Sequence, residues 1–159
     1  IVCNVDEKSL PGGNKYSDAC KKKFSGENII IVCADIEDQI MSLQTTDRKD
    51  FMLESGIKST GLDNLIKTGY TTLGLSTFFT SGPEESRAWT IEKNSKAADA
   101  AGVIHTDFKK KFIRAETVTH EDFIKYKGFN ECKNAGKLRL EGKDYLVNDG
   151  DVMYFRVGS

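Results

Sequence analysis

The spacing of apolar residues changes along the chain and predicts two parts that meet near residue 75. In the first part, the apolar run Ile1–Cys3 and the β-branched run Ile29–Cys33 are continuous rather than alternating. Continuous runs are typical of strands that are covered on both faces of a parallel sheet. A helical stretch, Tyr16–Phe24, lies between them, so we predict a parallel strand–helix–strand unit.

Helices are predicted to complete the first part. The first is marked by apolar residues at helical spacing: Ile36, Ile40 and Leu43. Thr46 is expected to cap the second helix, because a threonine hydroxyl readily accepts a hydrogen bond from a free N–H of the first turn. Thr60 is expected to open the third. The apolar stripe of that third helix consists of Leu62, Leu65, Ile66 and Tyr70.

The second part reads as short strands separated by turns. Strands are expected at Thr77–Thr80, Arg87–Ile91, Phe112–Val118, Leu138–Leu140, Tyr145–Val147 and Val152–Val157. An early helix is expected at Ala97–Ala101, with Gly102 as its carboxyl-terminal cap. Shorter helices are expected at His120–Tyr126 and Asn130–Ala135. A small sheet with one main early helix indicates a β-grasp fold, so the predicted class is α/β followed by α+β.

Composition narrows the possible functions. The chain has 159 residues, 30% of them charged, but its net charge is only −1, so any contact with nucleic acid must come from a local patch. No apolar run reaches the length of a membrane span, and no membrane partner is expected. Since the sequence begins inside a strand and without Met, we expect it to be the rear part of a longer protein.

The cysteines indicate neither a metal site nor a disulfide framework. They are Cys3, Cys20, Cys33 and Cys132, and none of them forms a C-x-x-C pair. Only two histidines are present to join them, so structural zinc is not expected. Cys3 and Cys33 lie in or beside apolar runs and read as buried reduced thiols, which fits a cytoplasmic protein.

Polar residues follow both strands of the first part. The carboxyl ends of parallel strands meet at one edge of a sheet, where ligands bind in open α/β folds. P-loop GTPases hold the purine there, with a carboxylate that accepts the two donors of guanine and a backbone N–H beside it. The candidate base-binding residues are Asn4, Val5, Glu7, Cys33, Ala34 and Asp35. The alternative is that Asn4 only caps a strand end and Glu7 is solvated.

Basic residues form two clusters in the second part. The candidate contacts to RNA or the ribosome are Lys109, Lys110, Lys111, Arg114, Lys137, Arg139 and Lys143. On one sheet face, and with Phe108 and Phe112 available for stacking, they would attract phosphates. The alternative is a solvated loop. His105-Thr106-Asp107 is read as a turn rather than a catalytic pair, because no positioned nucleophile accompanies it. No catalytic residue is expected.

Four segments closely resemble the YchF/Obg-like ATPase family. They are FFTSGPEESRAWTI (Phe78–Ile91), AAGVIHTDF (Ala100–Phe108), FIRAE (Phe112–Glu116) and EGKDYLVNDGDVMYFR (Glu141–Arg156). The resemblance implies that residues 1–74 are the carboxyl-terminal portion of a P-loop NTPase domain with a helical linker. It also implies that residues 75–159 are a TGS domain, which has a ubiquitin-like β-grasp fold. Asn4-Val5-Asp6-Glu7 looks like the base segment of that family, and Cys33-Ala34-Asp35 looks like its second base loop.

The same resemblance implies the activity of the parent protein. It would bind ATP or GTP with Mg²⁺, hydrolyse the nucleotide slowly and associate with the ribosome through ribosomal RNA. The sequence departs from the family pattern in having no glycine-rich phosphate loop, so this chain by itself is expected to be inactive. A competing hypothesis is a stand-alone β-grasp module that binds RNA or protein without nucleotide. A hydrolase that uses His105 is the least favoured.

Overall fold

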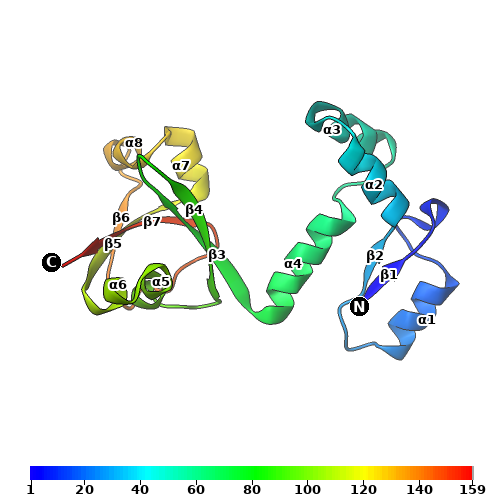
Figure 1. The fold of residues 1–159 in the computed structure, drawn as a ribbon, viewed down its shortest axis with the longest axis horizontal. Coiled ribbons are helices and arrows are strands. Elements are labelled where there is room, and N and C mark those ends of the chain that lie inside the picture. Colours follow the sequence, from blue (N-terminus) through cyan, green and yellow to red (C-terminus); the bar gives the residue numbers. More distant parts are fainter. Residues whose placement is uncertain (159) are drawn as a thin grey trace. The chain divides into compact units, whose positions relative to one another are not determined.

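The computed structural model describes residues 1–158. The chain divides into two compact units, one ending at Leu73 and the other beginning at Gly74 (Figure 1). The first unit combines a parallel pair of strands with helices, and the second has a mixed sheet with helices on both faces. The elements of the first unit are β1 (Val2–Asn4), η1 (Glu7–Ser9), α1 (Lys15–Lys23), β2 (Ile30–Val32), α2 (Ala34–Ser42), α3 (Thr45–Glu54) and α4 (Gly61–Leu73).

The predicted parallel strand–helix–strand unit is confirmed. Strands β1 and β2 pair in parallel with Cys3 opposite Ile31, and α1 lies between them in sequence. Helix α1 begins at a capping box, in which the Asn14 carboxamide accepts the Ser17 N–H at 3.2 Å and the Ser17 hydroxyl accepts the Asn14 N–H at 2.8 Å. Satisfying free N–H groups in this way fixes the start of a helix.

The start of α4 is fixed by two acceptors. The Thr60 hydroxyl accepts the Asp63 N–H at 3.0 Å, which confirms the predicted cap. Glu37 of α2 reaches across and accepts the Gly61 N–H at 2.6 Å. A Cβ at Gly61 would lie only 2.7 Å from a methyl carbon of Val32, so glycine is required by the close approach of α4 to β2.

Two details of the helices differ from prediction. Thr46 does not cap α3, because the helix already begins at Thr45 after Gln44, and the Thr46 hydroxyl hydrogen-bonds to the Asp47 carboxylate instead. On α4, Leu62, Leu65 and Ile66 stay about half exposed. The buried core of this unit centres instead on Cys33, Ile36 and Ile40. Within residues 1–158, no helix is both long enough and apolar enough to cross a membrane.

The second unit is built on a five-stranded sheet with the strand order β4-β3-β7-β5-β6. Its elements are β3 (Leu75–Ser81), β4 (Ser86–Glu92), α5 (Ala97–Ile104), α6 (Thr106–Lys110), β5 (Phe112–Thr119), α7 (His120–Tyr126), α8 (Phe129–Asn134), β6 (Arg139–Glu141) and β7 (Asp151–Val157). The first and last strands, β3 and β7, are parallel neighbours, whereas the other pairs are antiparallel.

Each face of this sheet carries its own cluster of apolar side chains. One face, the α5 face, buries Phe78, Met153 and Phe155 against the small residues of α5. The other face, the α7/α8 face, buries Val118 and Val152 under α7 and α8. Figure 1 shows α5 and α6 on one side of the strands and α7 and α8 on the other.

The elements of the second unit also show two differences from prediction. Helix α5 runs through Gly102 to Ile104, so Gly102 is not its cap; it lets the Lys109 side chain approach, which would lie 3.2 Å from a Cβ at that position. Tyr145–Val147 is not a strand, because only Leu146 forms a single bridge, to Lys96. The run Lys109–Lys110 belongs to helix α6.

A buried carboxylate ties the start of β6 to the start of β7. Asp151 is only 2% exposed and accepts hydrogen bonds from the Arg139 guanidinium (3.2 Å), the Tyr145 hydroxyl (2.8 Å) and the Asn148 N–H (2.9 Å). Burial, and then the hydrogen bond to Asp151, raise the pKa of Tyr145. These partners compensate for the cost of removing a charge from water.

Replacing Asp151 with alanine should therefore destabilise the second unit strongly. The change leaves the Arg139 and Tyr145 donors without their acceptor, and we expect a loss of about 3 kcal/mol. The measurement is denaturant unfolding followed by the fluorescence of Trp89, the single tryptophan of the chain. The matched control is Asp144→Ala, which removes an exposed carboxylate paired with Lys96 at 2.8 Å and should have a smaller effect. Equal losses in both variants would contradict this account.

Thr117 offers the opposite test. It is fully buried, and its hydroxyl is the buried side-chain polar atom without a hydrogen-bond partner within residues 1–158. Thr117→Val keeps the shape and removes the unsatisfied group, so the free energy of unfolding should rise by about 1 kcal/mol. The same Trp89 titration measures the change, and a destabilised Thr117→Val protein would show that the hydroxyl is needed.

Candidate functional site

The carboxyl ends of β1 and β2 form the edge at which the sequence predicts a base site. Strand pairing brings Asn4 opposite Val32, and the Val5 N–H donates to the Val32 carbonyl at 2.8 Å. Just beyond the strands, the Asn4 carboxamide oxygen accepts the Ala34 N–H at 3.0 Å. Cys33, the residue before α2, makes no side-chain capping hydrogen bond. Asn4 takes over this capping role by accepting a free N–H of the first turn.

The six candidate base-binding residues differ in what they can offer a ligand. The side chains of Val5 (7% exposed) and Cys33 (1% exposed) are buried, so they pack in the interior and cannot contact a ligand. The Ala34 N–H is engaged by Asn4. Glu7 and Asp35 are exposed, and within the described part of the chain their carboxylates have no hydrogen-bond or ion-pair partner. These two carboxylates are therefore available to accept hydrogen bonds.

Neighbouring residues explain why Glu7 rather than Asp6 is available. Asp6 caps η1 and accepts both the N–H and the hydroxyl of Ser9, at 3.1 and 3.0 Å. Glu7 lies in the first turn of η1 and stays free. The sequence pattern does not single out Glu37, whose carboxylate joins α2 to the start of α4, because a contact across 24 residues leaves no local signature.

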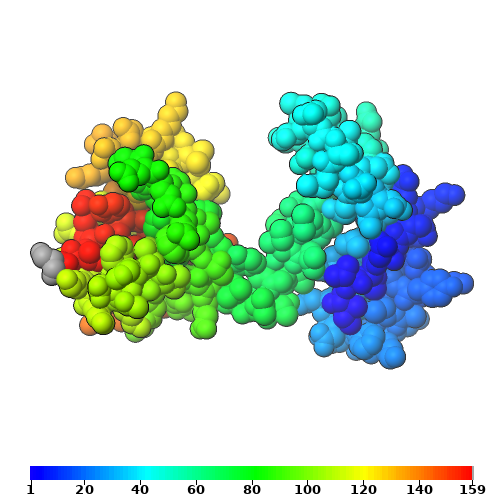
Figure 2. Space-filling model, viewed as in Figure 1, coloured from blue at the N-terminus to red at the C-terminus, as the bar shows by residue number. Residues whose placement is uncertain are grey.

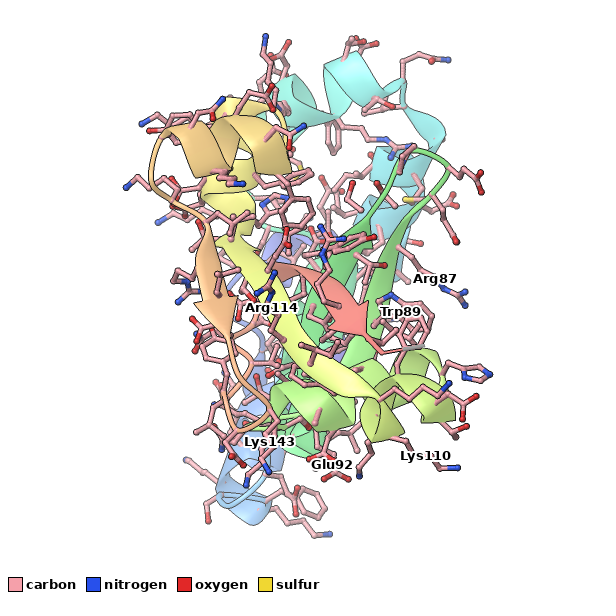
Figure 3. All side chains as sticks on the ribbon, turned by 90° about the vertical axis from the view of Figure 1, so that its left-hand side faces the viewer. Arg87, Trp89, Glu92, Lys110, Arg114 and Lys143 are labelled. Atoms are coloured by element: carbon pink, nitrogen blue, oxygen red, sulfur yellow. The ribbon has the colours of Figure 1, made fainter. Side chains whose placement is uncertain are left out.

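The seven candidate RNA-contact residues do not share one surface. Arg114 lies opposite Arg156 on β7, whereas Arg139 lies opposite the buried Thr117. Because side chains alternate between the faces of a strand, Arg114 and Arg139 are on opposite faces of the sheet. Figure 3 shows Arg114 where β5 runs beside β7, well separated from Lys110 and Lys143.

Two of these basic residues already have acidic partners. Lys109 pairs with Asp99 of α5 at 2.6 Å, and Arg139 is held by Asp151 and the Tyr145 hydroxyl. Lys110, Lys111, Arg114, Lys137 and Lys143 are exposed. The first basic cluster consists of Lys109, Lys110, Lys111 and Arg114. Its last three members form no ion pair within residues 1–158.

His105 makes the predicted hydrogen bond between its side chain and a backbone group, although Thr106 and Asp107 belong to helix α6 rather than to a turn. Its Nδ1 atom accepts the Asp107 N–H at 3.2 Å and caps α6. Within residues 1–158, no group of three His, Cys, Asp or Glu side chains is arranged to hold a metal ion.

Comparison with known proteins identifies the family. The model of the family YchF-GTPase_C, described as a protein of unknown function (DUF933), matches residues 75–158. The ribosome-binding ATPase YchF of Bacillus subtilis (strain 168) is 49% identical over 98% of this chain, and that of Escherichia coli O157:H7 is 47% identical over 97%. In both cases the chain covers 43% of the relative, so it spans less than half the length of the curated relatives it matches.

Solved structures agree with this relationship. The YchF GTPase of Schizosaccharomyces pombe is 34% identical and superimposes with a TM-score of 0.81, over 98% of this chain and 42% of that one. A GTP-binding protein from Pyrococcus horikoshii OT3 matches with a TM-score of 0.65 over 99% of this chain and 45% of that one; at 17% identity it supports the fold alone. Because the family model matches more than half of its residues, the chain belongs to the YchF-GTPase_C family.

Proposed function

We propose that this chain is the carboxyl-terminal part of a ribosome-associated P-loop ATPase or GTPase of the YchF type. Residues 1–74 would be the purine-recognition edge of the NTPase domain with its helical linker, and residues 75–159 a TGS domain with a β-grasp fold. The observation that carries the proposal is the hydrogen bond from the Ala34 N–H to Asn4, at the carboxyl ends of two parallel strands. This is the position at which open α/β sheets bind ligands.

Purine selection at this edge depends on the free carboxylate of Glu7. Guanine presents an N1–H and an amino group side by side, and one carboxylate can accept from both. Adenine has no N1–H and offers only its amino group. A glutamate is longer than the aspartate of ordinary guanine-binding segments, and this relaxes the two-point contact, so ATP is accepted as well as GTP. Asn4 joins the two loops that would contact the base, through its hydrogen bond from the Ala34 N–H.

Nucleotide hydrolysis requires parts that this chain does not supply. The triphosphate and its Mg²⁺ would be held by a glycine-rich phosphate loop and by metal-binding side chains in the intact parent. The residues of this chain bind and orient the base and move no proton. The chain alone is therefore expected not to hydrolyse ATP.

The topology of the second unit supports the proposal that it is a β-grasp module that contacts RNA. In its sheet, the first and last strands are parallel neighbours at the centre, which is the arrangement expected for a β-grasp fold. Relatives are named ribosome-binding ATPases, and this supports the ribosome as partner in the cytoplasm. The exposed lysines of α6 and the turn after it would supply part of the electrostatic attraction to ribosomal RNA.

Substitutions at the purine edge test the first half of the proposal. In the full-length protein from the gene that encodes this chain, Glu7→Ala should change the ratio of the ATP and GTP dissociation constants by about tenfold, because guanine loses a two-point partner. Asn4→Ala should weaken both nucleotides together, because it releases the Ala34 loop from the strand end. Equilibrium titration with fluorescent ATP and GTP analogues measures both effects.

Glu27→Ala is the matched control for this experiment. It removes an exposed carboxylate of the first unit from the loop before β2, and both dissociation constants should stay unchanged. An unaltered ATP-to-GTP ratio in Glu7→Ala would rule out the base-site assignment. It would then favour the module that binds RNA or protein without nucleotide.

Salt dependence tests the RNA contact. Replacing Lys110 and Lys111 with glutamine should lower ribosome affinity and flatten its dependence on salt, because each lost phosphate contact reduces the slope of log K against log salt by up to about 0.9. Sedimentation of the chain with ribosomes over a salt series gives this slope. Lys93→Gln, which removes an exposed charge at the end of β4, should leave it unchanged. A flat salt response of the unmodified chain would indicate contact with ribosomal protein.

A further inference from the structure

One half of the α7/α8 face of the second unit is open. At one end of this face, α7 and α8 bury Val118 and Val152. Towards the other end of the same strands, Arg114, Tyr154 and Arg156 project from the sheet and are exposed. In Figure 2 the red atoms of β7 reach the surface between the yellow-green helices α5 and α6 and the yellow and orange helices α7 and α8.

Two arginines face each other across this open half. Arg114 on β5 is directly opposite Arg156 on β7, and like charges in that position destabilise a sheet. Arg156 donates to Glu116 at 2.9 Å, which offsets one of the two charges. The Arg114 guanidinium has no hydrogen-bond or ion-pair partner within residues 1–158. A pair that costs stability, with one member uncompensated, is suited to an anion that bridges both guanidinium groups.

A stacking surface lies beside the arginines. Tyr154 is 42% exposed, and the Arg156 guanidinium carbon lies 4.5 Å from its ring centroid. The Phe129 ring of α8 contacts Tyr154 edge-on, with centroids 6.4 Å apart, and fixes its orientation. A guanidinium group over a tyrosine ring is a surface of the kind on which unpaired bases stack in RNA complexes.

A groove of about 540 Å³ adjoins this surface. It runs from the Ser81–Pro83 turn to the loop between α7 and α8, and Tyr154 and Arg156 line it. Asn130 adds a carboxamide that can hydrogen-bond to a base edge. Its acidic residues, Glu116 and Glu131, limit its positive charge, so the groove is suited to a short ligand rather than a long phosphate track.

We propose that this open half-face binds single-stranded RNA through one unpaired nucleotide. Its base stacks on Tyr154 and the Arg156 guanidinium, and its flanking phosphates contact Arg114 and Arg156. The inference rests on the proposed RNA contact of the second unit, and it names the face and the form of RNA that this contact takes. A side chain on β5 and two on β7 thereby form one site, whereas the lysines of α6 contribute only general attraction.

The experiment uses the whole chain and a fluorescein-labelled oligouridylate, with anisotropy measured between about 50 and 200 mM salt. Two phosphate contacts give a slope of about −1.4 for log K against log salt, and Arg114→Gln should reduce its magnitude by about 0.7. Tyr154→Ala should weaken binding by about five- to a hundredfold. Tyr154→Phe keeps the ring and should bind like the unmodified chain, which separates stacking from a folding defect. Arg114→Lys keeps the charge and should restore the slope.

Lys93→Gln is again the charge-matched control and should change nothing. Duplex RNA of equal length should compete poorly; equal competition would overturn the single-strand assignment. In one outcome, Arg114→Gln and Tyr154→Ala each leave binding unchanged while the double variant of Lys110 and Lys111 loses it. This result would overturn the assignment of the RNA site to the open half-face but would leave the proposed RNA contact of the second unit standing. Absence of oligouridylate binding by a chain that still sediments with ribosomes would also overturn it. Failure to bind either partner would overturn both proposals.

Discussion

The hydrogen bond between the Ala34 N–H and Asn4 is the interaction on which the first unit depends. It joins the last residue of β1 to the first turn of α2, and α2 in turn carries Glu37, whose carboxylate accepts the Gly61 N–H at the start of α4. Burial of Val5 and Cys33 beneath it leaves the edge little freedom to rearrange. A polar side chain is needed there because the first N–H groups of a helix have no partner within the helix. Glu7, in the first turn of η1, is exposed and has no hydrogen-bond or ion-pair partner within residues 1–158.

The second unit uses its two sheet faces differently. On the α5 face, the charged groups are turned inward and satisfied: Asp151 is buried, and Arg139 and Tyr145 donate to it. On the α7/α8 face, charge is left outside and partly unsatisfied, because α7 and α8 cover only one end of the strands. Both faces bury an apolar cluster, but only the α7/α8 face leaves an arginine pair, Arg114 and Arg156, exposed on neighbouring strands.

Local patterns in the sequence predicted which helices and strands form better than they predicted the first and last residues of each. The β-branched run at Ile29–Cys33 and the Thr60 cap were sufficient signals, since each depends on neighbouring residues. Thr46 misled because a threonine beside an aspartate can satisfy its hydroxyl without capping anything. Gly102 misled because a glycine can also serve close packing, here against Lys109. The Tyr145–Val147 segment has strand-like residues but finds no partner strand except at Leu146.

For the candidate sites too, features that depend on local sequence were predicted and features that depend on strand register were not. The meeting of the Asn4 and Ala34 segments follows from parallel strands alone. The basic residues could not be sorted in advance, because alternation along one strand does not give the register between strands, which decides whether residues of two strands share a face. Arg156 was not singled out at all; its pairing with Arg114 is set by strand register between segments about forty residues apart.

Gly61 gives the first unit a mechanical property. With no side chain between them, the start of α4 rests against Val32, the last residue of β2, while Glu37 holds its backbone. The strand end, α2 and the start of α4 are therefore held together by one close packing contact and one hydrogen bond. Any larger residue at position 61 would push the start of α4 away from Val32 and from the Glu37 carboxylate at the same time.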